Sequence, residues 1–273
     1  MRSPEDIISM RRIVIDRFHR INRVPTVTIN MDVAIAPAAA FKDRCNEDPR
    51  AKGVKITLNH VILKATAAAL REHIFFNYDY DGRYRIYPSE RIDIRTPVDF
   101  GEFPVHIVVP DTDKKDVFGI AAAFNEKLEE YRAKIESLME RYIAFQKNRR
   151  IMAAAVNALT EFTRRARPLV PPWQKRWFDL QHRVIGTFMV TNMGTLGVVD
   201  CHGQLVKPSI GALLVLAAKD VVELRDGTPV AKKVLPLALE FDNRVAELGQ
   251  AGAFLAAIKR NLEEPETYCG GAS

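Results

Sequence analysis

Acidic, amide and guanidinium side chains follow one another in the segment LEFDNRVAELG, which begins at Leu239. An acid and an arginine on either side of one residue commonly hold that residue in place through charge-assisted hydrogen bonds. The residue between Asp242 and Arg244 is Asn243, whose neutral amide can orient a ligand but has no useful acid–base chemistry. A further carboxylate follows at Glu247. The pattern predicts a site framework around a position that cannot accept a proton.

Three other side chains could take part in chemistry. The hydroxyl of Thr191 lies in GTFMVTN, a segment that predicts a strand. His202 follows Thr191 by eleven residues in the loop-like segment VVDCHGQ, and His106 lies in the predicted strand FPVHIVVP. Histidine is the side chain whose ordinary pKa suits proton transfer near neutral pH. An ordinary structural use of both histidines is the simpler interpretation, and catalysis is the alternative.

The composition is that of a globular protein with a sizeable core, since 47% of the 273 residues are hydrophobic and 27% are charged. The net charge of +6 permits an acidic partner without requiring one. The three cysteines match no metal-binding spacing, so we expect reduced thiols in a cytoplasmic protein and no metal site. The first residues lack the apolar core of a signal peptide, and no long apolar window predicts a transmembrane helix.

Periodicity and turn signals predict a mixture of strands and helices. Helices are expected from Ser3 to about Asn22, from Thr57 to Glu72, and in GQAGAFLAAIKRNLEE. A longer helix carries one apolar stripe at steps of three and four residues, formed by Ile120, Phe124, Leu128, Tyr131, Ile135, Leu138 and Tyr142. Strands are expected in VPTVTINMDVAI, ERIDIRTPVDF, FPVHIVVP, GTFMVTN, SIGALLVLAAK and KVLPLALEF, with a hairpin turn at Asp81-Gly82. This order predicts an α/β (α+β) fold, a mixed sheet with helices packed on it, in one domain over residues 1–273.

Four segments together resemble the catalytic domain of the dihydrolipoamide acyltransferases, the core subunits of 2-oxoacid dehydrogenase complexes. GTFMVTNMGTLGV resembles the family's GTFTISNLG, and LEFDNRVAELG resembles its SFDHRVIDG. DTDKKDVFGIAAAFNEKLEE is similar to DADKKSLLEIAEELKEL, and TLNHVILKATAAAL is similar to TDFIVKAVALAL. The order and spacing agree from about Met10 to Pro265. The resemblance implies the chloramphenicol acetyltransferase-like fold, a mixed sheet flanked by helices, assembled as a trimer with active sites between subunits.

The resemblance also implies roles for individual residues. In the family, the histidine of the DHR motif is the general base that removes a thiol proton, and a hydroxyl from the neighbouring subunit donates to the tetrahedral oxyanion. Thr191 stands at the hydroxyl position, and Asp242 and Arg244 match the framework. Asn243 stands at the histidine position, and Glu247 stands at the position of an aspartate that supports the histidine. The site therefore resembles one that was built for a general base and lacks it.

Three functions follow from this pattern. The favoured one is a non-catalytic scaffold that forms a trimer or a larger multiple of three, because losing a general base lowers a rate by about 10²- to 10⁴-fold. The first alternative is an active acyltransferase that moves acyl groups between coenzyme A and a separate lipoyl or other thiol carrier. His202 would then be the substitute base, with Glu247 a weaker one. The second alternative is a module that binds coenzyme A or a lipoyl arm without turnover. We expect no lipoyl domain and no covalently bound cofactor, with coenzyme A or acyl-CoA as the candidate ligand.

A basic insertion is expected at about residues 145–183, where the family usually has a short connection. Its positive charge comes from Arg149, Arg150, Arg164, Arg165, Arg167, Lys175, Arg176 and Arg183. A solvated helical excursion is the simplest interpretation, and a docking surface between trimers or for a protein partner is the next. Interfacial membrane contact through Trp173, Trp177 and Phe178 is less expected. We expect no nucleic-acid binding, because no recognised motif supports it.

Overall fold

The structure is a computed structural model of the chain, and it describes residues 24–81, 85–100, 104–148, 171–203, 205 and 208–269. It contains two compact units. The larger comprises residues 24–126 and 181–273, and the smaller includes residues 127–180. The predicted helix from Ser3 to Asn22 and residues 149–170 of the predicted insertion lie outside the described residues. The single-domain organisation stays a prediction.

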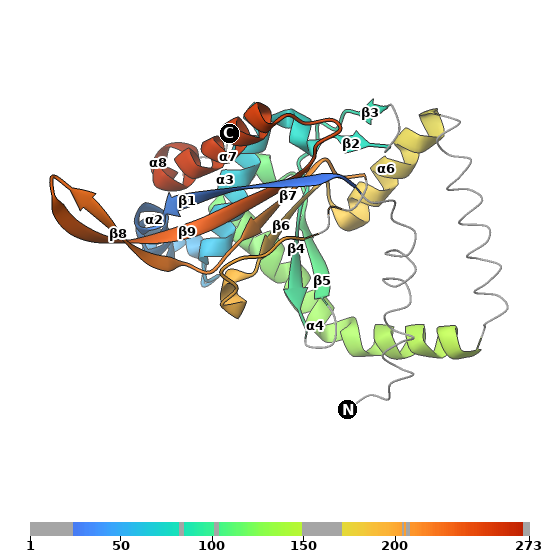
Figure 1. The fold of residues 1–273 in the computed structure, drawn as a ribbon. Helices are drawn as coiled ribbons and strands as arrows, with labels where there is room; N and C mark the ends of the chain where they lie inside the picture. Colours follow the sequence, from blue (N-terminus) through green and yellow to red (C-terminus); the bar gives the residue numbers. More distant parts are fainter. Residues whose placement is uncertain are drawn as a thin grey trace. The chain divides into compact units, whose positions relative to one another are not determined.

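The larger unit is built on one mixed sheet whose strand order is β1-β9-β7-β6-β4-β5, with β8 paired to β9 (Figure 1). The central strands β4, β6 and β7 are parallel, and the other pairs are antiparallel. A separate hairpin pairs β2 with β3. The strands are β1 Thr26–Ala34, β2 Asp79–Tyr80, β3 Ile86–Tyr87, β4 Ile94–Asp99, β5 Pro104–Val109, β6 Phe188–Asn192, β7 Gly211–Val215, β8 Lys219–Arg225 and β9 Thr228–Asp242.

Helices flank this sheet. α7 packs against β1 and β9, and α3 packs against α7. Phe254 of α7 is fully buried and stacks on Phe76 with ring centroids 4.8 Å apart. The helices are α2 Ala36–Glu47, α3 Leu58–Glu72, α4 Val117–Asn148, α6 Pro171–Ile185, α7 Leu248–Glu263 and α8 Pro265–Tyr268, with short 3₁₀ turns at Pro49–Ala51, Ile74–Asn77, Thr112–Lys114 and Gly194–Leu196. The predicted mixed sheet flanked by helices is confirmed.

The long helix predicted from the apolar stripe is α4, which begins at Val117, three residues before the first member of the stripe. Ile120 and Phe124, the first two members of the stripe, are buried in the larger unit. In α6, the predicted common surface of Trp173, Trp177 and Phe178 is wrong. Trp173 and Trp177 are exposed, but Phe178 is only 5% exposed, because a helix turns by about 100° per residue and carries Phe178 away from the tryptophans. The three aromatic residues therefore do not form one surface.

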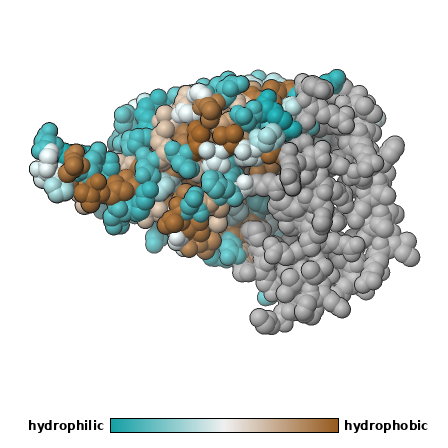
Figure 2. All heavy atoms as spheres, viewed as in Figure 1, coloured by the Kyte–Doolittle hydropathy of each residue, from teal (hydrophilic) through white to brown (hydrophobic). Residues whose placement is uncertain are grey.

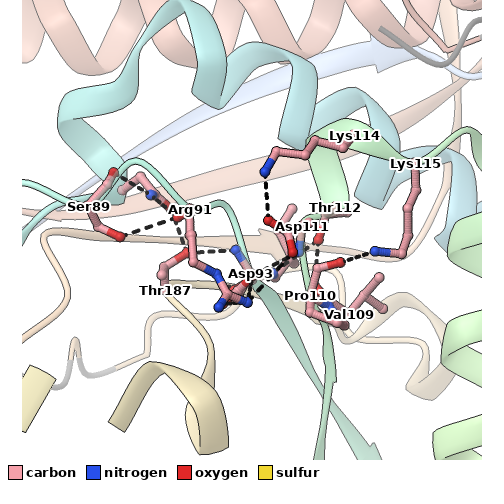
Figure 3. Close-up of polar contacts among 12 residues, drawn as sticks. Ser89, Arg91, Asp93, Val109, Pro110, Asp111, Thr112, Lys114, Lys115 and Thr187 are labelled. Carbon is pink, nitrogen blue, oxygen red and sulfur yellow. Dashed lines mark hydrogen bonds and ion pairs between the residues drawn. The ribbon is translucent and has the colours of Figure 1, made fainter. Parts of the chain in front are cut away.

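The DTDKK segment fixes the end of β5 next to the start of β4 (Figure 3). Asp111 adopts a left-handed backbone conformation with φ of 46°, and its N–H donates to the buried carboxylate of Asp93 at 2.8 Å. Arg91 lies 3.0 Å from the same carboxylate, and the Lys114 amine lies 3.0 Å from that of Asp111. Thr187, the residue just before β6, accepts a hydrogen bond from the Asp93 N–H. This motif therefore has a structural role at the junction of β4, β5 and β6.

Candidate active site

A tight turn after β9 holds the predicted framework. The buried carboxylate of Asp242 accepts hydrogen bonds from Nε and Nη2 of Arg244 at 2.9 and 2.5 Å, and from the Arg244 backbone N–H at 3.1 Å. The guanidinium of Arg244 also lies over the Tyr80 ring at 5.1 Å. The hydrogen bonds to Asp242 raise the pKa of Arg244. The two residues on either side of position 243 form a bidentate pair with each other.

Asn243 is exposed in this turn, and its backbone N–H donates to the Pro25 carbonyl at 3.0 Å. Glu247 is also exposed and is the N-cap of α7, with its N–H donating to Oε1 of Gln250 at 3.0 Å. Because α7 begins at Leu248, positions 243 and 247 do not lie on one helix. A carboxylate at a helix N-terminus is favourable with the helix dipole, so Glu247 has a structural use whatever else it does.

Thr191 lies on β6, and its hydroxyl donates only a weak contact of 3.7 Å to the Met193 sulfur. Across the sheet, Thr191 pairs with Leu214 of β7, and Leu214 pairs with Ala238 of β9. Two strand spacings and four residues along β9 therefore separate Thr191 from Asp242, which corresponds to about 16 Å. Thr191 and Asn243 of one chain are too far apart to act on one thiol.

A buried acid, Glu240, lies two residues before Asp242 on the same face of β9. Its carboxylate accepts the N–H of Gly203, and a Cβ at Gly203 would lie only 2.9 Å from Glu240 Oε2. Burial raises the pKa of Glu240 above its ordinary value. The contact fixes the loop that carries His202, whose side chain is 63% exposed and lies 3.8 Å from Asp200. Sequence reasoning missed Glu240, although an acid within the apolar run VLPLALEF was a signal.

A second feature missed from the sequence is a buried pair of His182 and Asp79. Nε2 of His182 lies 2.9 Å from Asp79 Oδ2, without the alignment of a hydrogen bond. Asp79 forms a β-bridge with Ser209, just before β7, and the next residue, Tyr80, carries the Arg244 guanidinium. The pair therefore ties the end of α6 to the hairpin beside the candidate site.

The other candidates lie further away. His106 is on β5 opposite Pro97, and β4, β6 and β7 separate that strand from β9. Among the described residues, no group of three His, Cys, Asp or Glu side chains is placed to hold a metal ion. In the same part of the chain, no helix is both long and apolar enough to cross a bilayer.

The family model of the 2-oxoacid dehydrogenases acyltransferase catalytic domain matches residues 3–141 and 150–269. The chain belongs to this family. A relative from Bacillus subtilis, the dihydrolipoyllysine-residue acetyltransferase component of the acetoin cleaving system, is 24% identical over 264 residues, 95% of this chain and 55% of the relative. The acetyltransferase component of the pyruvate dehydrogenase complex of Zymomonas mobilis is 20% identical over 94% of this chain and 49% of its own length. The chain thus spans about half the length of these curated relatives.

Solved structures of this family share the fold. The cubic core of a pyruvate dehydrogenase multienzyme complex superposes with a TM-score of 0.71 at 21% identity, over 95% of this chain and 90% of that one. The dihydrolipoamide acetyltransferase of Azotobacter vinelandii gives 0.69 at 20% identity with the same coverage, in a study of the roles of a serine, a histidine and an asparagine in its catalytic mechanism. The fold class predicted from the sequence resemblance is confirmed.

Proposed function

We propose that this chain is a non-catalytic, core-forming member of the acyltransferase family, a cytoplasmic trimeric scaffold whose general base has been replaced by Asn243. The observation that supports this proposal most directly is the spacing of three site residues along the chain. In the Azotobacter protein the serine and the histidine are 52 positions apart, and the asparagine follows four positions later. Thr191, Asn243 and Glu247 have the same two separations. This agreement in spacing supports the assignment of Asn243 to the position of that histidine, next to the hydrogen-bonded Asp242–Arg244 pair.

The consequence for catalysis follows from the chemistry of thiols. A free thiol has a pKa of about 8.5 and is mostly protonated at neutral pH, so transfer of an acyl group to it needs a base. The amide of Asn243 can donate and accept hydrogen bonds but cannot hold the thiol proton. Loss of the base corresponds to about 10²- to 10⁴-fold in rate, or about 3 to 5 kcal/mol in the barrier.

Two features support a trimer or a multiple of three. The separation of about 16 Å between Thr191 and Asp242 fits a site that takes its two halves from different subunits. In addition, β8 and the first half of β9 form a two-stranded ribbon, which is marginally stable without a partner. Val222 and Leu224 on this ribbon are 70% and 72% exposed, and Figure 2 shows apolar surface there. A neighbouring subunit would cover it.

A second candidate function is acyl transfer between coenzyme A and a separate thiol carrier. The hydroxyl of Thr191 and the Asp242–Arg244 pair are the observations that favour it, since both would serve an oxyanion and its binding site. His202 would be the substitute base, because it is exposed and Asp200 lies 3.8 Å away.

Light scattering during size-exclusion chromatography, followed by calorimetry with coenzyme A, tests the scaffold. We expect a trimer or a multiple of three and no heat of binding. A stable monomer at micromolar concentration would contradict both the scaffold and the shared site. Binding of coenzyme A without transfer to dihydrolipoamide would instead identify a binding module.

A further inference from the structure

The loop between β6 and β7 lies over the sheet face that carries Thr191. Residues directly opposite each other in paired strands share a face, so Leu214 of β7 and Ala238 of β9 lie on the Thr191 face. Both are buried, and Val198 and Cys201 of the loop pack against the apolar cluster that contains them. The loop therefore covers the part of the face beside the Thr191 hydroxyl.

One hydrogen bond attaches the middle of this loop to the sheet. The Gly203 N–H donates to the buried carboxylate of Glu240, and this is the single hydrogen bond of the described residues 199–203 and 205. A Cβ at Gly203 would lie 2.9 Å from Oε2 and 3.3 Å from Oε1 of that carboxylate. The loop backbone thus lies directly against both carboxylate oxygens and shields them from water.

The same stretch has few other attachments. Val199 is 68% exposed, and the side chains of Asp200 and His202 also lie on the surface. Cys201 packs on the sheet but is only partly buried, and fully buried packing resumes at Leu205. Segments with few buried contacts and few hydrogen bonds open at a low cost in free energy. Residues 199–203 are therefore the part of this loop that opens most easily.

Glu240, the acceptor of that hydrogen bond, is a titratable group whose burial opposes its charge. It is 1% exposed, and burial raises the pKa of its carboxyl group more than the Gly203 N–H and the nearby His202 lower it. Its neighbours across the sheet, Ala212 of β7 and Thr28 of β1, carry no charge. The loop and the end of β9 also carry Asp200, Asp242 and Arg244, of which the last two form an ion pair.

We propose that residues 199–203 form a lid on the Thr191 face of the sheet, which Glu240 holds closed through Gly203 and releases when its carboxyl group loses a proton. The closed lid favours the protonated acid, whereas an open lid lets water reach the carboxylate. Raising the pH above 4.5, the ordinary pKa of this group, therefore shifts the equilibrium towards the open lid until the raised pKa is passed. This inference concerns access to the site and does not depend on whether the chain is a scaffold or an enzyme.

Cys201 offers a selective probe, because it lies in the lid while the other two cysteines, Cys45 and Cys269, are buried. The full chain reacts with 4,4′-dithiodipyridine between pH 5 and pH 8, and mass spectrometry locates the modified thiol. Each rate is divided by that of the free peptide VVDCHGQ, which corrects for the titration of a thiol. We expect the corrected rate at Cys201 to rise by at least about threefold over this range.

Two substitutions separate the contact from its titration. Glu240→Gln keeps an acceptor for the Gly203 N–H but cannot ionise, so the corrected rate at Cys201 should stay at the wild-type pH 5 value throughout. Gly203→Ala places a Cβ against the carboxylate, so its rate at pH 5 should already exceed that of the wild type by about threefold or more. Gly252→Ala, where nothing lies within 4 Å of the added Cβ, is the matched control and should react like the wild type.

Cys45 and Cys269 report on the rest of the fold, since both should stay unreactive in every folded variant. The proposal is overturned if the corrected wild-type rate at Cys201 is constant with pH, or if Gly203→Ala shields Cys201 as well as the wild type does. It is also overturned if Glu240→Gln keeps the rise or reacts fast at every pH. Equal rises at all three cysteines would overturn it too, because the chain would then be unfolding as a whole.

Discussion

His60 gives the protein a defined sensitivity to acid. It lies in the first turn of α3, where its Nδ1 accepts the backbone N–H of the N-cap residue Thr57 at 3.2 Å. The imidazole is 2% exposed and packs edge-on against Phe124 at 5.3 Å. Burial disfavours the charged form and lowers the pKa of His60 from 6.5 to about 4. Protonation must therefore break a buried contact or unfold the chain.

The size of the effect follows from the two pKa values. As the pH falls, the unfolded chain takes up the proton first, because its histidine has the higher pKa. With respect to His60, the free energy of unfolding has its full value above pH 6.5, and it decreases as the pH falls towards 4. The difference between the two values corresponds to about 3 kcal/mol. This part of the sensitivity to acid therefore comes from one side chain, that of His60.

Urea unfolding of the wild type and of His60→Gln, at one protein concentration, measures how much His60 contributes to the change of stability with pH. His60→Gln should be the less stable protein at pH 7, and the difference should shrink by about 3 kcal/mol between pH 7 and pH 4. Ile62→Val, which removes one methyl from a fully buried residue of the same helix, should cost about 1 kcal/mol at every pH. A His60→Gln difference that stays constant with pH would refute the reasoning.

Three further substitutions test the core and the sheet by the same unfolding assay. Burial raises the pKa of Glu240, so the free energy of unfolding of the wild type should decrease as the pH rises above 4.5. Glu240→Gln should not show this decrease. A Glu240→Gln variant that is less stable than the wild type at neutral pH would contradict the prediction. Gly186 has φ of 66° and a Cβ there would lie 2.5 Å from the Asp93 carbonyl, so Gly186→Ala should cost about 2 kcal/mol or more, while Gly249→Ala, in open space, should not destabilise. Phe254→Ala should cost about 3 to 5 kcal/mol; a cost under about 1 kcal/mol would contradict its central packing.

The elements that sequence reasoning found are those with strong local patterns. The apolar stripe predicted α4, and Thr57 marked the start of α3. α2 was missed because it follows β1 directly, with Ile35 as an N-cap that makes no capping bond. β8 was missed although Asp226-Gly227, with φ of 49° and 78°, is the same turn signal as Asp81-Gly82. β8 is exposed on both of its faces, and its sequence therefore lacks the alternation of apolar and polar residues that reveals a strand.

The candidate site was only partly readable from the sequence. Asp242 and Arg244 were singled out because they flank position 243, but the sequence did not predict that they bind each other, as the structure shows. The pairing of His182 with Asp79 joins segments far apart in the chain, and no local pattern encodes it. The burial of Glu240 likewise depends on a distant glycine, Gly203, that leaves room for the carboxylate.

The central claim is that position 243 has lost the general base, and the initial rate of acetyl transfer from acetyl-CoA to dihydrolipoamide tests it most directly. We expect no measurable turnover from the wild type and partial turnover from Asn243→His, since Thr191 still offers a hydroxyl and Asp242 still holds Arg244. Adding Thr191→Val to Asn243→His should lower the rate again by about 10²-fold. Robust wild-type turnover that falls with Thr191→Val would contradict the account and identify a working enzyme with another base.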